Sequence, residues 1–478
     1  MRRTQRFAAL VLGLSAFLGS ASLASAQTAR PAAAPPVSLH ITRSPQNAVS
    51  AEYRLARPAR ALHFAPQLDG YRASDWQPAT PDFRWVREGD GERIERTDGQ
   101  PFTRLTFDIP VRYRSLEKSY APFSPFSDGG LLVYSGHFQT CTALPCKGTE
   151  PLAVTIAAEG ATIGVGGKRT AASAAFTSRE EGTNIYIGSA EPAATAGFLA
   201  IVDPALQPVL RDHLLESLPQ SMRDFAAIYG ALTITPELYV SLDPQPPART
   251  GLSSQGGTLP GQVFIHLYGD GWRKPIVPNE VLWLDWFFAH EAAHFFQRAG
   301  TNDIIGPDSE GWIHEGGADA MAALVMRERS DTLRRYVDRR IAEARKACAT
   351  GLASVALSNA SRAGKFDLHY QCGMLIALAI DADVRRESAG ARTLHDVNRR
   401  FFATVRAGTP WNGRSFLEAA RRSGVSPPTL AAITLITRQK LTDPARQIDA
   451  MLQQAGVDWQ GMDQAQAEPA APSAPATR

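Results

Sequence analysis

The chain has 478 residues, of which 44% are hydrophobic and 20% are charged; this is ordinary for a globular protein and long enough for two to three domains with a large buried core. Its formal net charge of +3 equals the contribution of Arg2, Arg3 and Arg6, so the chain beyond them is close to neutral. It therefore lacks the positive field that concentrates nucleic acid or an anionic membrane, and we expect neither as a partner.

Residues 1–26 have the three parts of a secretory signal peptide. They are the basic segment MRRTQRF, the apolar segment AALVLGLSAFLG and the small-residue cleavage site ASA. The apolar segment is too short to span a membrane, and no later window reaches 18 apolar residues. We therefore expect an exported protein without a membrane span, located in the periplasm or outside the cell.

Residues 27–36, QTARPAAAPP, have the composition of a flexible linker. From 37 to 203, Gly, Pro and Asp separate short runs that alternate or are rich in β-branched residues: VSLHITR, RLTFDIPVRY, GLLVYSGHF, LAVTIAA, TNIYIGS and GFLAIVD. Such runs between turn signals are typical of strands. The pattern predicts an N-terminal antiparallel β-sandwich.

Helical periodicity begins after residue 203. Residues 204–330 combine an amphipathic run with two predicted strands, LTITPELYVSL and GQVFIHLYG, which flank the Gly- and Ser-rich loop RTGLSSQGGTLPG. Residues 331–458 have helical spacing, and the polar tail 459–478, rich in Ala and Pro, is expected to be disordered. The predicted fold class is α+β and multidomain, with a mostly α-helical C-terminal region.

Four cysteines remain beyond the signal peptide: Cys141, Cys146, Cys348 and Cys372. None has zinc-finger spacing, and an exported protein meets an oxidising compartment, so two disulfides are favoured over metal ligation. The simplest pairing joins Cys141 to Cys146 and Cys348 to Cys372, although the sequence permits three pairings.

The segment FFAHEAAHFFQ at 287–297 places two histidines four residues apart among aromatic side chains. Because a helix turns about 100° per residue, His290 and His294 lie on one face and can direct two imidazoles at one point, as zinc ligands do. Glu291 projects from the neighbouring face. There its carboxylate can reach a water at the metal without binding the metal itself.

A histidine in an apolar helix is more often a hydrogen-bonded core residue than a ligand. Two features favour the metal here. The His-Glu-x-x-His spacing is rare by chance, and the surrounding aromatic side chains indicate a buried helix. Burying two histidines and a glutamate is costly unless they are paired or coordinate a metal.

A second helical segment, GWIHEGGADAMAALVMRE, follows at 311–328. Glu315 can supply a carboxylate oxygen as the third ligand, which completes a His₂Glu set with one position open for water. Asp319 lies four residues later on the same face. It is placed to accept the free N–H of one ligand histidine and so fix its tautomer.

These residues resemble the gluzincin zinc metallopeptidases, most closely aminopeptidase N and glycyl aminopeptidase, and more remotely thermolysin. The resemblance covers about 205–430. It rests on His-Glu-x-x-His, on the Trp-x-x-Glu-Gly segment that contains Glu315, and on HYQCGMLIALAID at 369–381, which is similar to a Tyr-x-x-Gly helix segment of aminopeptidase N relatives. It implies a thermolysin-like zinc catalytic domain, Zn²⁺ as cofactor, and Tyr370 as the residue that stabilises the tetrahedral intermediate.

The sequence departs from this family in one segment. Aminopeptidases of this type carry a Gly-x-Met-Glu-Asn-like segment whose glutamate binds the substrate's α-amine, whereas SSQGGTLPGQVFIHLYG has no acidic residue. Residues 262–267 are expected to keep the edge strand that aligns the substrate backbone. An acidic residue of the β-rich region, such as Glu150 or Asp128, is the competing source of an amine anchor, so aminopeptidase and endopeptidase action both stay open.

The sequence therefore predicts a secreted zinc-dependent peptidase acting on a peptide or protein substrate. Glu291 would be the general base, and His290, His294 and Glu315 the metal ligands. Two alternatives remain: a catalytically inactive zinc-bearing binding or scaffold protein of the same fold, and a zinc amidase or esterase. The sequence leaves the oligomeric state open.

Overall fold

The computed structural model describes residues 36–457 apart from 45–47, 66–69, 89–90, 117–118, 143, 145, 147–149, 180, 196 and 245–249. The predicted signal peptide, residues 27–35 of the predicted linker and the predicted disordered tail lie outside the described residues. Within the described part of the chain, no helix has both the length and the apolar character needed to cross a bilayer.

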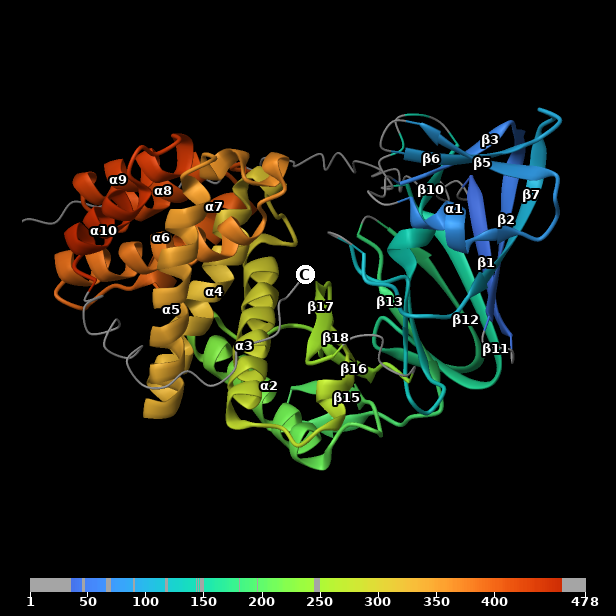
Figure 1. The fold of residues 1–478 in the computed structure, drawn as a ribbon, viewed down its shortest axis with the longest axis horizontal. Coiled ribbons are helices and arrows are strands. Elements are labelled where there is room, and N and C mark those ends of the chain that lie inside the picture. The colour runs from blue at the N-terminus through green and yellow to red at the C-terminus, as the bar shows by residue number, and fades with distance from the viewer. Residues whose placement is uncertain are drawn as a thin grey trace, which may run out of the picture. The chain divides into compact units, whose positions relative to one another are not determined.

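Two sheets form the N-terminal region, drawn in blue to blue-green in Figure 1. The larger has the order β4-β7-β2-β1-β11-β13-β9-β8, with β12 paired to β11. Its strands are β1 (Val37–Ser44), β2 (Ala48–Ala59), β4 (Gln77–Pro78), β7 (Phe102–Pro110), β8 (Phe123–Pro125), β9 (Leu131–Tyr134), β11 (Leu152–Val165), β12 (Lys168–Ser178) and β13 (Asn184–Gly188). The smaller has the order β10-β3-β6-β5 and consists of β3 (Ala61–Phe64), β5 (Phe83–Glu88), β6 (Gly91–Arg96) and β10 (Thr140–Cys141).

The two sheets share one apolar core, to which the short helix α1 (Tyr71–Asp75) also contributes. Phe64 of the smaller sheet contacts Tyr53 and Phe107 of the larger one, with ring centroids 5.7 and 6.1 Å apart. This is the predicted sandwich. It differs in one pairing, because β1 and β11 run parallel. A strand shows the same alternation of buried and exposed residues in a parallel and in an antiparallel pair, so the sequence pattern did not reveal that β1 and β11 are parallel.

A third sheet has the order β14-β15-β16-β18-β17. It contains β14 (Ala193–Thr195), β15 (Phe198–Val202), β16 (Glu237–Leu242), β17 (Ser253–Leu259) and β18 (Gln262–Tyr268). Strands β15, β16 and β18 are parallel to one another, and β17 is antiparallel to β18. Strands β14 and β15 precede residue 203, so this sheet includes chain on both sides of that position. The domain limits at 203 and 330 stay predictions.

Residues 253–259 correct one expectation from the sequence. They were expected to be part of a Gly- and Ser-rich loop, with 262–267 as the edge strand, but they form β17, and β17 is the edge of the sheet. Glycine is needed at positions 256 and 257 because neighbouring atoms leave no space for a Cβ atom, and not because the segment forms a loop. A Cβ atom on Gly256 would lie 2.3 Å from the carbonyl oxygen of Phe264, and one on Gly257 would lie 2.6 Å from the hydroxyl of Tyr120.

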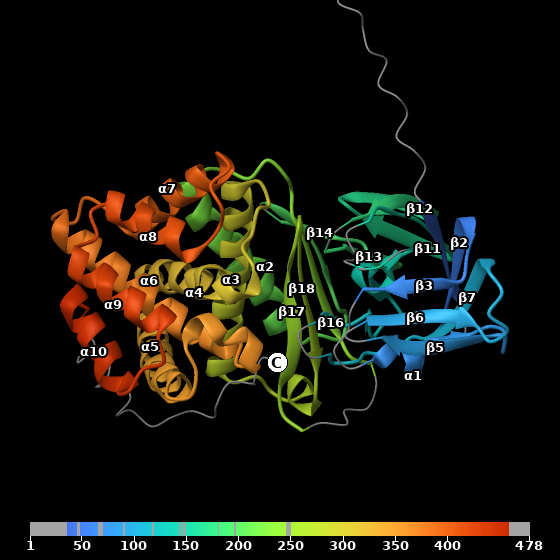
Figure 2. The same ribbon diagram turned by 90° about the horizontal axis from the view of Figure 1, so that it is seen from above.

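Apart from loops and short 3₁₀ turns, helices form the rest of the described chain. They are α2 (Pro208–Tyr229), α3 (Pro278–Thr301), α4 (Gly311–Arg329), α5 (Asp331–Leu352), α6 (Asp367–Glu387), α7 (Leu394–Arg406), α8 (Gly413–Arg422), α9 (Pro427–Arg438) and α10 (Pro444–Ala455). Figure 2 shows α2 and α3 beside the third sheet, with α4–α10 beyond them. Both β16 and β18 are buried along their whole length, as expected for strands covered on both faces.

Side chains of the third sheet alternate between two cores. Val240 and Ile265 face the helices, whereas Tyr239 and Phe264 join a small core with Phe126 and other residues of the N-terminal region. A polar contact fixes the same junction: the side-chain oxygen of Gln262 accepts a hydrogen bond from the backbone N–H of Asn184 at 2.9 Å. The N-terminal region is therefore packed and hydrogen-bonded directly against the sheet that carries β17.

The four cysteines form two disulfides, Cys141–Cys146 and Cys348–Cys372. This confirms the simplest of the three pairings that the sequence permits. The second disulfide joins α5 to α6, and α6 also carries Tyr370.

Candidate metal centre

Helix α3 carries His290 and His294. Pro278 stands in its first turn, and the Glu280 carboxylate accepts a hydrogen bond from the backbone N–H of Val277 at 2.8 Å, so the start of the helix is fixed locally. Every residue from Trp283 to Arg298 is buried, which agrees with the aromatic sequence of this segment. The Nε2 atoms of the two histidines face each other at 2.9 Å.

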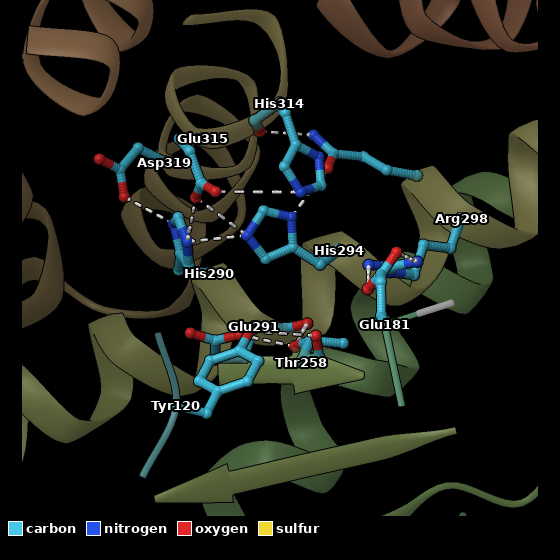
Figure 3. A network of polar contacts seen from close by, with 11 residues as sticks. Tyr120, Glu181, Thr258, His290, Glu291, His294, Arg298, His314, Glu315 and Asp319 are labelled. Carbon is cyan, nitrogen blue, oxygen red and sulfur yellow. Dashed lines mark hydrogen bonds and ion pairs between the residues drawn. The ribbon is translucent and has the colours of Figure 1, made fainter. Parts of the chain in front are cut away.

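Helix α4 brings the third candidate ligand to the same point. Oε2 of Glu315 lies 3.3 Å from Nε2 of His290 and 3.2 Å from Nε2 of His294. The three atoms form a small triangle between the two helices (Figure 3). The Glu315 side chain is 25% exposed whereas both histidines are buried, so the triangle is accessible from the Glu315 side.

The outer nitrogens of both histidines are occupied, which settles their tautomers. Nδ1 of His290 lies 2.8 Å from a carboxylate oxygen of Asp319. Nδ1 of His294 lies 2.9 Å from Oε1 of Gln297, whose amide nitrogen donates to the carbonyl oxygen of His314. Both Nδ1 atoms must therefore donate, and in a neutral imidazole Nε2 then carries a lone pair.

With both rings neutral, three electron-pair donors thus converge with no hydrogen between them. Burial acts to lower the pKa of His290, but Asp319 and Glu315 outweigh it and raise that pKa well above its ordinary value. Burial acts to raise the pKa of Glu315, but His294 and His290 hold it well below its usual range. The group therefore requires positive charge, supplied either by a proton or by a cation.

The donor set fits zinc. Zinc favours imidazole nitrogen and carboxylate oxygen in tetrahedral sites, and bonds of about 2.0–2.1 Å place neighbouring ligand atoms roughly 3.3 Å apart. Two of the three separations in the triangle, 3.2 and 3.3 Å, match this spacing, and the third, 2.9 Å, is slightly shorter. Both histidines also have the hydrogen-bond partner on the outer nitrogen that metal-bound imidazoles almost always have.

Glu291 lies on the neighbouring face of α3 and is 5% exposed. Its carboxylate oxygen Oε2 accepts a hydrogen bond of 2.6 Å from the hydroxyl of Thr258 on β17. The short distance is typical of a hydroxyl donating to a charged carboxylate. Strand β17 therefore holds the side chain that would serve as general base.

Helices α4 and α6 approach closely because glycines meet where they cross. A Cβ atom on Gly316 would lie 2.3 Å from the Cα atom of Gly373, and one on Gly373 would lie 2.3 Å from the carbonyl oxygen of Trp312. This approach brings Tyr370, one turn before Gly373, onto His290. Their rings stack with centroids 5.7 Å apart and planes inclined by 26°.

Tyr370 is 37% exposed, so it borders the accessible side of the triangle. Enclosure by the surrounding protein, followed by the negative charges of Glu315 and Glu291, raises the pKa of Tyr370 well above its usual value. The hydroxyl therefore keeps its proton and can act as a hydrogen-bond donor.

The structure adds three residues that the sequence analysis did not name. Thr258 contacts Glu291, Gln297 orients His294, and the ring of His314 packs on His294 with centroids 4.2 Å apart. Gln297 lies three residues after His294, a helical spacing that indicates contact. Nothing in the sequence around Thr258 indicates its partner, because Glu291 is far along the chain.

Neither acidic residue considered as an amine anchor has a described contact with α3. Asp128 accepts a hydrogen bond from the backbone N–H of Gly130 within its own turn, and no described contact joins Glu150 to α3. Among the described residues of the N-terminal region, the acidic residue Glu181 contacts helix α3. Its carboxylate pairs with the guanidinium of Arg298, one turn beyond His294, at 2.7 Å.

No protein-family model matches this sequence, and no curated protein matches it either. Solved structures do. An aminopeptidase N family protein from Idiomarina loihiensis is similar over 85% of this chain and 76% of its own, with 9% sequence identity and a TM-score of 0.58. The α+β fold of this chain is therefore the fold of that protein, as the resemblance in the sequence implied.

Two further structures come from Deinococcus radiodurans. One is an M1 zinc metallopeptidase with 12% identity and a TM-score of 0.44, covering 85% of this chain and 93% of its own. The other is a mutant of an M1 zinc metallopeptidase bound to a Tyr-Ser-Ala substrate, with 13% identity, a TM-score of 0.48, and coverage of 85% and 94%. These scores are lower, so the fold assignment depends on the Idiomarina structure.

Proposed function

We propose that this protein is a zinc-dependent peptidase. The observation that carries the proposal is the convergence of Nε2 of His290, Nε2 of His294 and Oε2 of Glu315 on one point, with Glu291 and Tyr370 beside them. A zinc ion held by these atoms supplies Lewis-acid polarisation of a carbonyl oxygen and of water.

The chain's own residues supply the proton transfers. Glu291 accepts a proton from the attacking water as the water oxygen bonds to the carbonyl carbon, and later gives that proton to the amine nitrogen as the C–N bond breaks. Tyr370 donates a hydrogen bond to the oxygen on which negative charge develops. Asp319 and Gln297 occupy the outer nitrogens of His290 and His294, so in the neutral rings the inner nitrogens are the ones that would bind the zinc.

The same residues argue against a purely structural zinc site. A structural site is closed by four protein ligands, whereas a catalytic site has three and one open position. The described residues offer three ligand atoms, on a side where Glu315 and Tyr370 are accessible. A buried carboxylate and a tyrosine donor next to them would serve no purpose in a scaffold.

The test is hydrolysis of a peptide library by the zinc-loaded protein, with and without a chelator, and with ester and amide substrates in parallel. We expect peptide cleavage that the chelator abolishes. Glu291→Gln should keep the zinc and the fold but lose about 10²- to 10⁴-fold in turnover, because an amide cannot accept the water's proton. Cleavage of esters or simple amides alone would replace the peptidase with the amidase or esterase alternative. No hydrolysis at all would favour the inactive scaffold.

We further propose that the enzyme does not require a free substrate N-terminus. Residues 253–267 include no carboxylate, and the charge of Glu181 is already matched by Arg298. A site without an unpaired carboxylate has no charge-assisted contact with which to select an α-ammonium group.

The proposed location is outside the cytoplasm. It is supported by the signal-peptide pattern of residues 1–26 and by two disulfides, which persist mainly in oxidising compartments.

A further inference from the structure

Thr258 lies on β17 with its side chain directed at α3. Strand residues alternate between faces, and the contacts of this strand follow that rule. A Cβ atom on Gly256 would meet the Phe287 ring of α3, and one on Gly257 would meet Tyr120. Thr258 shares the α3-facing side with Gly256. Figure 3 shows it next to Glu291, below the candidate metal ligands in that view.

The contact between Thr258 and Glu291 is short and buried. The hydroxyl Oγ1 of Thr258 lies 2.6 Å from Oε2 of Glu291 and 3.2 Å from its backbone oxygen. Thr258 is 6% exposed and Glu291 is 5% exposed. Water therefore has little access to this oxygen, and the hydroxyl is the donor that satisfies it.

Strand β17 is itself braced at this residue. The hydroxyl of Tyr120 approaches the backbone oxygen of Thr258 at 3.5 Å, and Tyr120 is held in turn by His137, whose Nε2 lies 2.5 Å from the Tyr120 backbone oxygen. The hairpin partner of Thr258 is Val263, next to Gln262, which is bonded to Asn184. Thr258 therefore lies at the junction between the N-terminal region and the third sheet.

We infer that Thr258 is a positioning residue for the general base. This rests on the proposed function, because it assigns a purpose to Glu291 only if Glu291 transfers protons. The last torsion of a glutamate side chain has a broad, weakly defined minimum. A hydrogen bond to Oε2 fixes that torsion and leaves Oε1 free to take the proton. The bond can persist when Oε1 is protonated, since Oε2 is then a carbonyl oxygen that still accepts.

The inference predicts a specific pattern among substitutions. Thr258→Val keeps the shape and removes the donor, so kcat should fall about 10- to 100-fold, with KM changed by less than about twofold. Thr258→Ser restores the hydroxyl and should recover most of kcat. Zinc content should stay at the wild-type level in both, because Thr258 contacts no candidate ligand in the described structure. The matched control is Thr437→Val in α9, where an equally buried hydroxyl donates within its own helix.

A second measurement is independent of turnover. In a crystal structure of zinc-loaded Thr258→Val, the Glu291 carboxylate should be rotated or spread over several positions, whereas in Thr258→Ser it should match the wild type. If the wild type cleaves peptides and Thr258→Val cleaves them equally fast with an unmoved carboxylate, the inference is wrong while the proposed function stands. If the zinc-loaded wild type cleaves nothing, the proposed function fails and this inference fails with it.

Discussion

Helices α3 and α4 and the β17–β18 hairpin contribute to the candidate site in different ways. Helices α3 and α4 supply the three candidate ligand atoms and also Asp319 and Gln297, which contact the outer nitrogens of the two histidines. The hairpin supplies no candidate ligand among the described residues and instead holds Glu291, the proposed general base, through Thr258. The comparison indicates that metal affinity and base position are separable properties of this site.

The largest effect should come from removing a ligand on the helices. Purified zinc-loaded protein should contain about one zinc per chain, and His290→Ala or Glu315→Ala should lose most of it together with all measurable hydrolysis. Metal analysis checks this, with His213→Ala on α2 as a histidine control that keeps its zinc. Wild-type zinc content in both ligand variants would show that the metal, if any, binds elsewhere.

Tyr370→Phe should leave metal binding intact and reduce turnover. The hydroxyl acts on charge that develops only in the transition state, so kcat should fall about 10²- to 10³-fold while KM changes little. Steady-state kinetics with zinc content measured on the same sample checks this. Tyr336→Phe, which removes a tyrosine hydroxyl from α5, should behave like the wild type. A large rise in KM at constant kcat would instead make Tyr370 a substrate-binding residue.

Removing the orienting groups should weaken zinc binding without abolishing it. Asp319→Ala should lower zinc affinity about 10- to 100-fold. Gln297→Ala should lower it by less, because the negative carboxylate of Asp319 also attracts the cation whereas the neutral amide of Gln297 does not. Competition with a chelator of known affinity measures both. Equal losses would show that orientation of the imidazole matters and the charge of Asp319 does not.

The smallest effect on the cleavage rate should come from blocking the N-terminus of the substrate. Peptides of one sequence, with a free and with an acetylated N-terminus, should be cleaved at rates within about threefold of each other, since residues 253–267 contain no carboxylate to select the amine and Glu181 is paired with Arg298. Chromatography of the products measures both rates. Strict dependence on a free N-terminus would mean that Glu181 leaves Arg298 and binds the amine, and Glu181→Gln would then abolish that dependence.

The helices were more predictable than the hairpin for a physical reason. The spacing of His290 and His294, and of Glu315 and Asp319, is a local property of one helical turn, and it can be read from a few residues. The meeting of α3 with α4 depends on the whole fold; the residue types predicted Glu315 as a third ligand, and the resemblance to a known family supported that prediction.

The hairpin depends on contacts between distant parts of the chain. Gly256 and Gly257 look like loop residues, but Phe264 and Tyr120 leave no space for a side chain at these positions. The Pro260-Gly261 pair was a usable signal, since Pro followed by Gly is typical of a two-residue turn between strands. Gly261 indeed has φ +75°. The bond from Thr258 to Glu291 had no sequence signal, and the same is true of the parallel pairing of β1 with β11.

Strand β15 determines where this protein can be divided. Residues Leu199–Val202 pair with Glu237–Val240, so a recombinant fragment that starts at residue 204 would leave one edge of β16 without a partner. Such an edge is a template for pairing between copies. The loss of Ile201 and its neighbours would also expose Tyr239, which packs in the same small core. A shortened enzyme should therefore begin before β14, or the fragment is expected to aggregate before its chemistry can be measured.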